Sequence, residues 1–204
     1  MRAEQGPLQT KALQTMREVL GEEFRTLEVR GYEISEDFGD GHCTITCKAV
    51  ENPGERAFSV DGKGVGMLDA FFSGLRERYQ GEFPSLGSIR FSSFSVRGLM
   101  GDANAEQATD AQAEATVGVT NSSNTEFHFT ALSPSVSHSS MEAVLAAVEY
   151  FVNSEQAYVR IYKALQHHKT SGRPEMVARY TELLAEMVRN TSYSSAVERL
   201  QAQE

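Results

Sequence analysis

The chain has 204 residues and a formal net charge of −9, with 28 acidic against 19 basic side chains. This length predicts one domain with an appendage and a sizeable core, and the negative charge disfavours a nucleic-acid partner because a polyanion is repelled. No apolar run approaches the roughly 20 residues that cross a bilayer, and the N-terminus has no apolar signal segment. We therefore expect a cytoplasmic protein with no membrane partner.

The first predicted element is a helix within an N-terminal segment of residues 1–22. Pro7 suits a first helical turn, and Ala12, Met16 and Leu20 recur at the spacing of one buried helix face. Two roles for this helix stay open: a remnant of a linker, and a helix that docks a partner.

A first unit of three strands and one helix follows over residues 24–80. Strand candidates span residues 24–34, 43–50 and 57–60, and turns rich in Gly, Asp and Pro separate them. An amphipathic helix then runs from about residue 66 to residue 79. The unit is β-β-β-α.

A second unit over residues 88–165 repeats this order of elements, although not the residue identities. The apolar phase slips between Phe91 and Phe94, which predicts a bulge in its first strand. The predicted elements are strands at 89–98, 113–119 and 127–131, a loop at 100–112, and a helix that begins near Ser139.

The order of elements predicts an α+β fold, in which two β-β-β-α units related by pseudo-twofold symmetry form a domain over residues 23–165. A C-terminal helical tail follows over residues 166–204, with Pro174 opening a helix and a short last helix at residues 191–204. Because a single helix covers a sheet face only in part, pairing the two units and then two chains would bury the remainder. The sequence therefore predicts a homodimer.

Glycines at positions 62, 64 and 66 connect the third strand to the first helix, and Asp69 lies in the first turn of that helix. Glycine lets the backbone turn sharply and lets another group approach closely, and the first N–H groups of a helix can hold a carboxylate. Asp69 would offset the helix dipole or meet an ammonium group. These residues predict a small-molecule site at Gly62, Gly64, Gly66 and Asp69, with a tight strand-to-helix turn as the alternative.

The run Gly64-Val-Gly-Met-Leu-Asp69-Ala70-Phe71 resembles a motif of the C-terminal regulatory (allosteric, dimerisation) domain of 2-isopropylmalate synthases and of the related citramalate synthases. That motif reads Gly-x-Gly-x-Val-Asp-Ala-aromatic. Residues 127–153 lie where the same domain has its second junction of this kind, and the resemblance covers about residues 24–165. It implies an effector-binding module.

The second junction departs from the family pattern, because Ser133, Ser135 and Ser139 stand where that domain has Gly-x-Gly and then Asp. Serines can cap a helix and donate to a carboxylate, but their Cβ atoms narrow a pocket, and Pro134 removes an N–H group. Asn153 matches the Asn that closes that family's helix. We expect a ligand that differs from leucine in shape, or that binds more weakly.

Catalytic and metal-binding residues are not predicted. The adjacent His167 and His168 point about 100° apart on a helix and cannot share one metal, and no Gly-x-Ser-x-Gly nucleophile elbow accompanies His138 and its neighbouring serines. The synthases that the chain resembles carry a catalytic (β/α)₈ barrel of about 250 residues. The chain has no room for that barrel and no His-x-His pair, so we expect no enzyme activity, metal or cofactor of its own.

The leading hypothesis is a freestanding regulatory module. It would form a homodimer, bind a leucine-like amino acid at the glycine-rich junction, and regulate a separate synthase subunit. The alternative is a purely structural dimerisation scaffold that has lost its ligand, which the serine substitutions favour. A small hydrolase or transferase is disfavoured because no nucleophile and base are paired in the sequence.

Overall fold

The computed structural model describes residues 6–99 and 112–190. Within these ranges the chain forms two sheets, each of three antiparallel strands, together with four α-helices and two short 3-10 helices. Most of the loop predicted at 100–112 and the short helix predicted at 191–204 lie outside the described residues. The elements are α1 (Pro7–Leu20), η1 (Gly21–Glu23), β1 (Thr26–Asp37), β2 (His42–Asn52), β3 (Arg56–Gly64), α2 (Met67–Tyr79), η2 (Pro84–Ser88), β4 (Arg90–Leu99), β5 (Gln112–Thr120), β6 (Glu126–Ser133), α3 (Val136–Thr170) and α4 (Pro174–Asn190).

The first unit is a sheet of order β1-β2-β3 with α2 packed on one face. In β2, Cys43, Ile45 and Cys47 are buried while the intervening threonines are exposed, because successive side chains of a strand point to opposite faces. Phe71 and Leu75 of α2 are fully buried and belong to the same apolar core as this face.

The second unit is a sheet of order β4-β5-β6 that packs against α3. Ala115 of β5 and Phe129 of β6 are buried, and the residues on either side of each are less buried. The register of β4 against β5 shifts between Phe91 and Ser93, so the bulge predicted there is confirmed. The α+β fold of two β-β-β-α units is confirmed with it.

Helix α3 is the central element of the molecule and has 35 residues. It contains neither Gly nor Pro between Val136 and Thr170, and Tyr158, Ile161 and Leu165 extend its buried face well past the sheet. The boundary predicted at residue 165 therefore falls inside a continuous helix. Beyond its end, Gly172 adopts a φ of +63°, and α4 begins two residues later.

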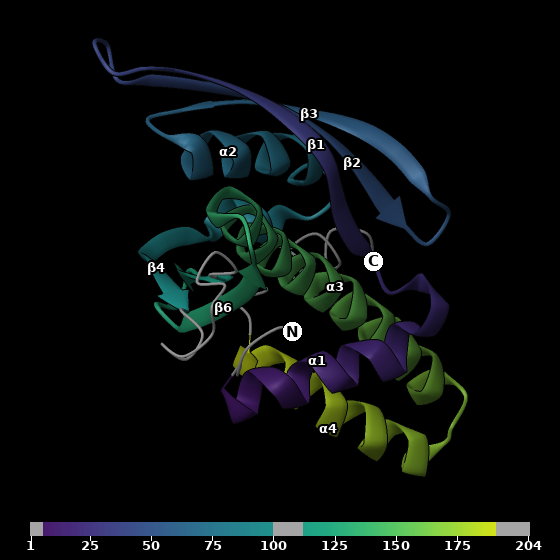
Figure 1. Cartoon of the computed structure of the whole chain (residues 1–204). Helices are drawn as coiled ribbons and strands as arrows, with labels where there is room; N and C mark the ends of the chain where they lie inside the picture. The colour runs from purple at the N-terminus through teal and green to yellow at the C-terminus, as the bar shows by residue number, and fades with distance from the viewer. Residues whose placement is uncertain (1–5, 100–111, 191–204) are drawn as a thin grey trace.

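The layers follow from these contacts (Figure 1): α2 lies beneath the first sheet, α3 crosses the centre, and α1 and α4 lie together against α3. The predicted N-terminal helix thus packs on its own chain, with Ala12 and Met16 fully buried. The C-terminal helix α4 joins the same layer through Met187, which is also fully buried.

Each sheet is covered only in part by its helix. Tyr32 and Ile34 of β1 pair with buried residues of β2, so they lie on the covered face, yet they are 37% and 40% exposed. Phe94 and Val96 of β4 pair with buried residues of β5 and are 50% and 40% exposed. One edge strand of each sheet, β1 in the first and β4 in the second, therefore presents apolar side chains that the helix of its unit does not cover.

Candidate effector site

The junction between β3 and α2 is a close contact between backbones. A Cβ at position 62 would overlap the carbonyl of Ala70, and a Cβ at position 64 would lie 2.5 Å from the Ala70 nitrogen. Gly74 of α2 is in an equally close contact, since a Cβ added there would lie 2.8 Å from the Asp61 carbonyl oxygen. Gly62 and Gly64 are thus needed for helix-to-strand packing, and their role in holding an effector stays a prediction.

Gly66 differs from the two glycines before it. Its φ is −173°, an extended backbone that any residue adopts, and a Cβ there would meet nothing within 4 Å. It precedes α2 without giving it a side-chain cap, and the neighbouring Val65 is 82% exposed. Asp69 bends back so that Oδ2 accepts a hydrogen bond from the Val65 N–H at 3.1 Å. The start of α2 is therefore open beside Gly66.

An open hollow of about 400 Å³ lies beside Gly62, with walls from β2, β3 and α2. Its charged lining residues are Lys63, Asp61 and Glu77. The Thr46 hydroxyl donates to Asp61 Oδ1 at 2.7 Å and holds that carboxylate in place. Groups of both charge signs therefore border one hollow next to the glycine-rich junction.

The second junction, between β6 and α3, is filled by its own serines. Ser135 Oγ accepts from the His138 N–H at 3.3 Å and caps α3, while Ser133 Oγ accepts from the Ser135 N–H at 3.2 Å. The fully buried Ser139 donates to the Val136 carbonyl at 3.0 Å. The three predicted serines are brought together here, and each makes a hydrogen bond within the chain.

The second junction also contacts the first unit, because the Tyr32 hydroxyl of β1 donates to Ser137 Oγ at 2.7 Å. Within the described part of the chain, no hydrogen bond or ion pair joins the predicted residues of the two junctions. A shared role of the two junctions in binding an effector stays a prediction.

His138 lies beside Ser133, a contact that the sequence did not indicate. Its Nδ1 is 3.0 Å from Ser133 Oγ, and its Nε2 is 3.7 Å from a carboxylate oxygen of Glu142. A hydrolase would need such a pair, but Ser133 is 7% exposed and its oxygen already accepts a backbone N–H. The contact therefore stabilises the start of α3.

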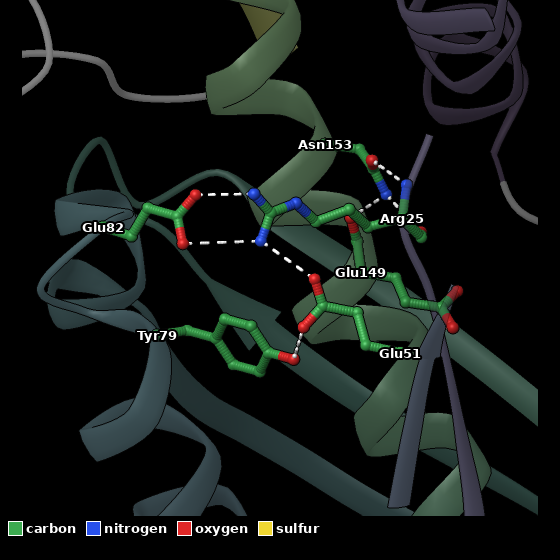
Figure 2. Close-up of polar contacts among 6 residues, drawn as sticks. All are labelled: Arg25, Glu51, Tyr79, Glu82, Glu149 and Asn153. Carbon is green, nitrogen blue, oxygen red and sulfur yellow. Dashed lines mark hydrogen bonds and ion pairs between the residues drawn. The ribbon is translucent and has the colours of Figure 1, made fainter. Parts of the chain in front are cut away.

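Two polar side chains of α3 hold the chain at the start of β1. The Asn153 amide accepts from the Arg25 N–H and donates to the Arg25 carbonyl, both at 2.8 Å (Figure 2). Glu149 accepts from the Leu27 N–H at 2.7 Å. Asn153 is fully buried and Glu149 is 3% exposed. Asn153 thus lies within α3 and connects the two units, whereas the resemblance placed it at the end of a helix.

The Arg25 side chain extends this cluster to the first unit (Figure 2). Its guanidinium donates to Glu82 at 2.6 Å and to Glu51 at 3.1 Å, and the Tyr79 hydroxyl donates to the other Glu51 oxygen at 2.7 Å. Burial raises the pKa of the Tyr79 phenol, and the nearby Glu51 raises it further. The cluster is a fully paired structural connection.

Across residues 6–99 and 112–190, no group of three or more His, Cys, Asp and Glu side chains is placed to hold a metal ion. No helix in these ranges is both long enough and apolar enough to cross a membrane.

A family model described as the LeuA allosteric (dimerisation) domain matches residues 9–152, which is more than half of the chain. The chain belongs to the LeuA allosteric domain family. The resemblance carried by the run from Gly64 to Phe71 is therefore confirmed. A comparison with curated proteins gave no match for the chain.

The LeuA allosteric domain match begins in α1 and ends inside α3. It starts earlier than the predicted range of 24–165, so most of α1 belongs to the family region. The C-terminal part of α3 and all of α4 lie beyond the match.

Sequence reasoning about the LeuA allosteric domain missed the hollow beside Gly62 and the cluster around Arg25. A signal for the cluster was present, because Glu149 lies between Leu145 and Val152 on the apolar face of a predicted helix. For the hollow, strict alternation puts Lys63 and Asp61 on the exposed face of β3 and Gly62 on the face that α2 covers, so the pattern alone did not indicate that these residues line one hollow.

Proposed function

We propose that this LeuA allosteric domain is a cytoplasmic, dimeric effector-binding module that binds a small amino-acid-like metabolite. It regulates a separate synthase and catalyses no reaction itself. The observation that carries the proposal is the family match across both β-β-β-α units and both junctions. Regulation follows if the ligand binds more tightly to one packing of the dimer than to another.

The open side of the β3–α2 junction supports an α-amino acid as the ligand. Lys63 supplies a positive charge for a carboxylate, and Asp61 and Glu77 supply negative charges for an ammonium group, all around one hollow. At about 400 Å³ the hollow is of a size for a small metabolite.

A second candidate function is a dimerisation scaffold without an effector. The close packing of Gly62 and Gly64 against α2 favours it, because that packing alone explains both glycines. The serines of the second junction favour it too, since they make hydrogen bonds within the chain.

Thermal unfolding in the presence of each of the twenty amino acids tests the proposal, with light scattering on the same samples. We expect one branched-chain amino acid to raise the melting temperature. The Lys63→Gln variant should lose that shift, whereas Lys48→Gln, an exposed lysine of β2 that does not line the hollow, should keep it. A stable dimer that none of the twenty compounds stabilises would support the scaffold.

A further inference from the structure

A second hollow lies where α1, α3 and α4 meet, and its volume is about 280 Å³. No residue of either junction lines it. Its α3 and α4 walls come from residues after 152, where the family match ends. Membership of the LeuA allosteric domain family therefore assigns no role to this hollow.

Apolar residues of three helices line the second hollow and form its apolar floor. Val19 of α1, Ala164 of α3 and Leu183 of α4 are partly exposed, and Ile161 of α3 is fully buried beside them. The side chain of Ala164 is only a methyl group, so a longer side chain at this position would extend into the hollow. The Tyr180 ring forms a wall and stacks on the His168 ring, with centroids 5.3 Å apart and planes 16° apart, so its orientation is fixed.

Two arginines line the same hollow from helices that pack together, Arg160 from α3 and Arg179 from α4. Arg160 uses one nitrogen of its guanidinium to pair with Glu23 at 3.0 Å, and no second ion pair of this group is found within residues 6–99 and 112–190. Among the described residues, no ion pair joins Arg179 to an acidic side chain. The one acidic lining residue, Glu18, accepts a hydrogen bond from Gln14 at 2.9 Å.

We propose that this second hollow binds a small apolar carboxylic acid, with its carboxylate between Arg160 and Arg179 and its hydrocarbon body on Val19, Ala164 and Leu183. Arginine suits this ligand because its planar fork donates two hydrogen bonds to a carboxylate. An inorganic anion would leave the apolar floor uncovered, and a cation would be repelled by Arg179, with which no acidic side chain of the described residues is paired. The site goes beyond the proposed function and does not depend on it.

A ligand in this position would touch three helices and would hold α4 against α3. Binding to the folded chain alone raises its stability by mass action. The thermal stability of the full chain therefore reports binding, without any partner or assay of activity.

The experiment measures melting temperature and dissociation constant of the full chain with 4-methylpentanoate and phenylacetate at neutral pH. Their uncharged amides and inorganic phosphate are compared at equal concentration. We expect the two acids to stabilise the chain and the amides and phosphate to have little effect. Arg179→Gln should weaken acid binding about tenfold or more, and Ala164→Leu, which fills the hollow, should remove it. Lys163→Gln, an exposed lysine of α3 that does not line the hollow, should bind as the wild type.

Equal stabilisation by the acids and their amides would overturn the proposal, and so would acid binding that survives both Arg179→Gln and Ala164→Leu. A shift that phosphate matches would also overturn it, because the apolar floor would then contribute nothing. Lys63→Gln should leave acid binding here unchanged. Failure of this site is thereby distinguished from failure of the effector site beside Gly62.

Discussion

The three glycines of the β3–α2 junction look equivalent in the sequence, yet each has different surroundings. At Gly62 and Gly64 the α2 backbone occupies the space that a Cβ would need, whereas Gly66 has nothing within 4 Å. Backbone cannot move aside as the end of a long side chain can. A methyl group at Gly62 therefore affects folding, whereas one at Gly66 meets no other atom of the described chain within 4 Å.

Gly62→Ala should lower the free energy of unfolding by about 1–3 kcal/mol, the range for inserting atoms into a packed interior. Gly66→Ala should change it by less than about 0.5 kcal/mol, as for a surface position. Urea unfolding of the two variants and the wild type measures both effects. Equal stabilities for the two variants would contradict the different packing of these glycines.

The buried phenol of Tyr79 makes stability depend on alkaline pH. Burial raises its pKa above the ordinary value of 10.0, so the folded chain holds the phenolic proton more tightly than the unfolded chain does. Its contribution is complete below pH 10.0 and is lost as the pH rises towards the raised pKa. Tyr79→Phe should lose about 1 kcal/mol at pH 8 and should fall off less steeply than the wild type between pH 9 and 11, as measured by urea unfolding. Parallel curves would exclude this role.

At the residue scale, the sequence indicated the close backbone contact at a glycine, but it did not indicate the hydrogen-bond partners of the polar side chains. Close approach at Gly62 follows directly from the absence of a Cβ. The hydrogen bond from Tyr79 to Glu51 could not be predicted, since it joins residues from a helix and a strand whose relative orientation only the packed sheet defines. Likewise, His138 beside Ser133 depends on the turn between β6 and α3.

At the scale of elements, α3 has two functions, and its periodicity reveals only the first. Its apolar face covers the second sheet, as the spacing of apolar residues predicts. Its polar side chains Glu149 and Asn153 also hold the first residues of β1, which belongs to the other unit. Sequence patterns identify which face of a helix is buried, but the partner of a buried polar group depends on tertiary contacts.

Asn153→Ala should therefore loosen β1 more than it loosens α3. The substitution leaves the Arg25 N–H and carbonyl without the amide that binds both, which costs about 1–3 kcal/mol for a buried polar group. Amide hydrogen exchange should accelerate at Arg25 and Leu27, with smaller changes in the middle of α3. Asn121→Ala, which removes a buried amide that closes the β5–β6 turn, is the matched control and should leave the start of β1 protected. Equal protection of Arg25 in the wild type and in Asn153→Ala would exclude this connection.

At the scale of the whole molecule, both units have a sheet whose apolar face is covered only in part. Each sheet has three strands and a single packed helix of its own, and the outer strands β1 and β4 keep apolar side chains exposed on the covered face. Exposed apolar residues grouped on one face are typical of interaction sites. The family is described as a dimerisation domain, so a second copy of the chain is the partner that we expect to cover these strands.

Charged substitutions on these strands test where the dimer forms. A lysine at Ile34 or at Phe94 would have to be buried without a partner at the interface, at a cost of about 3 kcal/mol or more, which weakens association more than about a hundredfold. Light scattering at micromolar concentration should show a dimeric wild type and monomeric Ile34→Lys and Phe94→Lys variants. Val188→Lys places the same charge at a 52% exposed apolar residue of α4 and should stay dimeric. If Ile34→Lys and Phe94→Lys stay dimeric while Val188→Lys dissociates, the interface lies on the helical layer, because the incompletely covered sheets would then have no part in association.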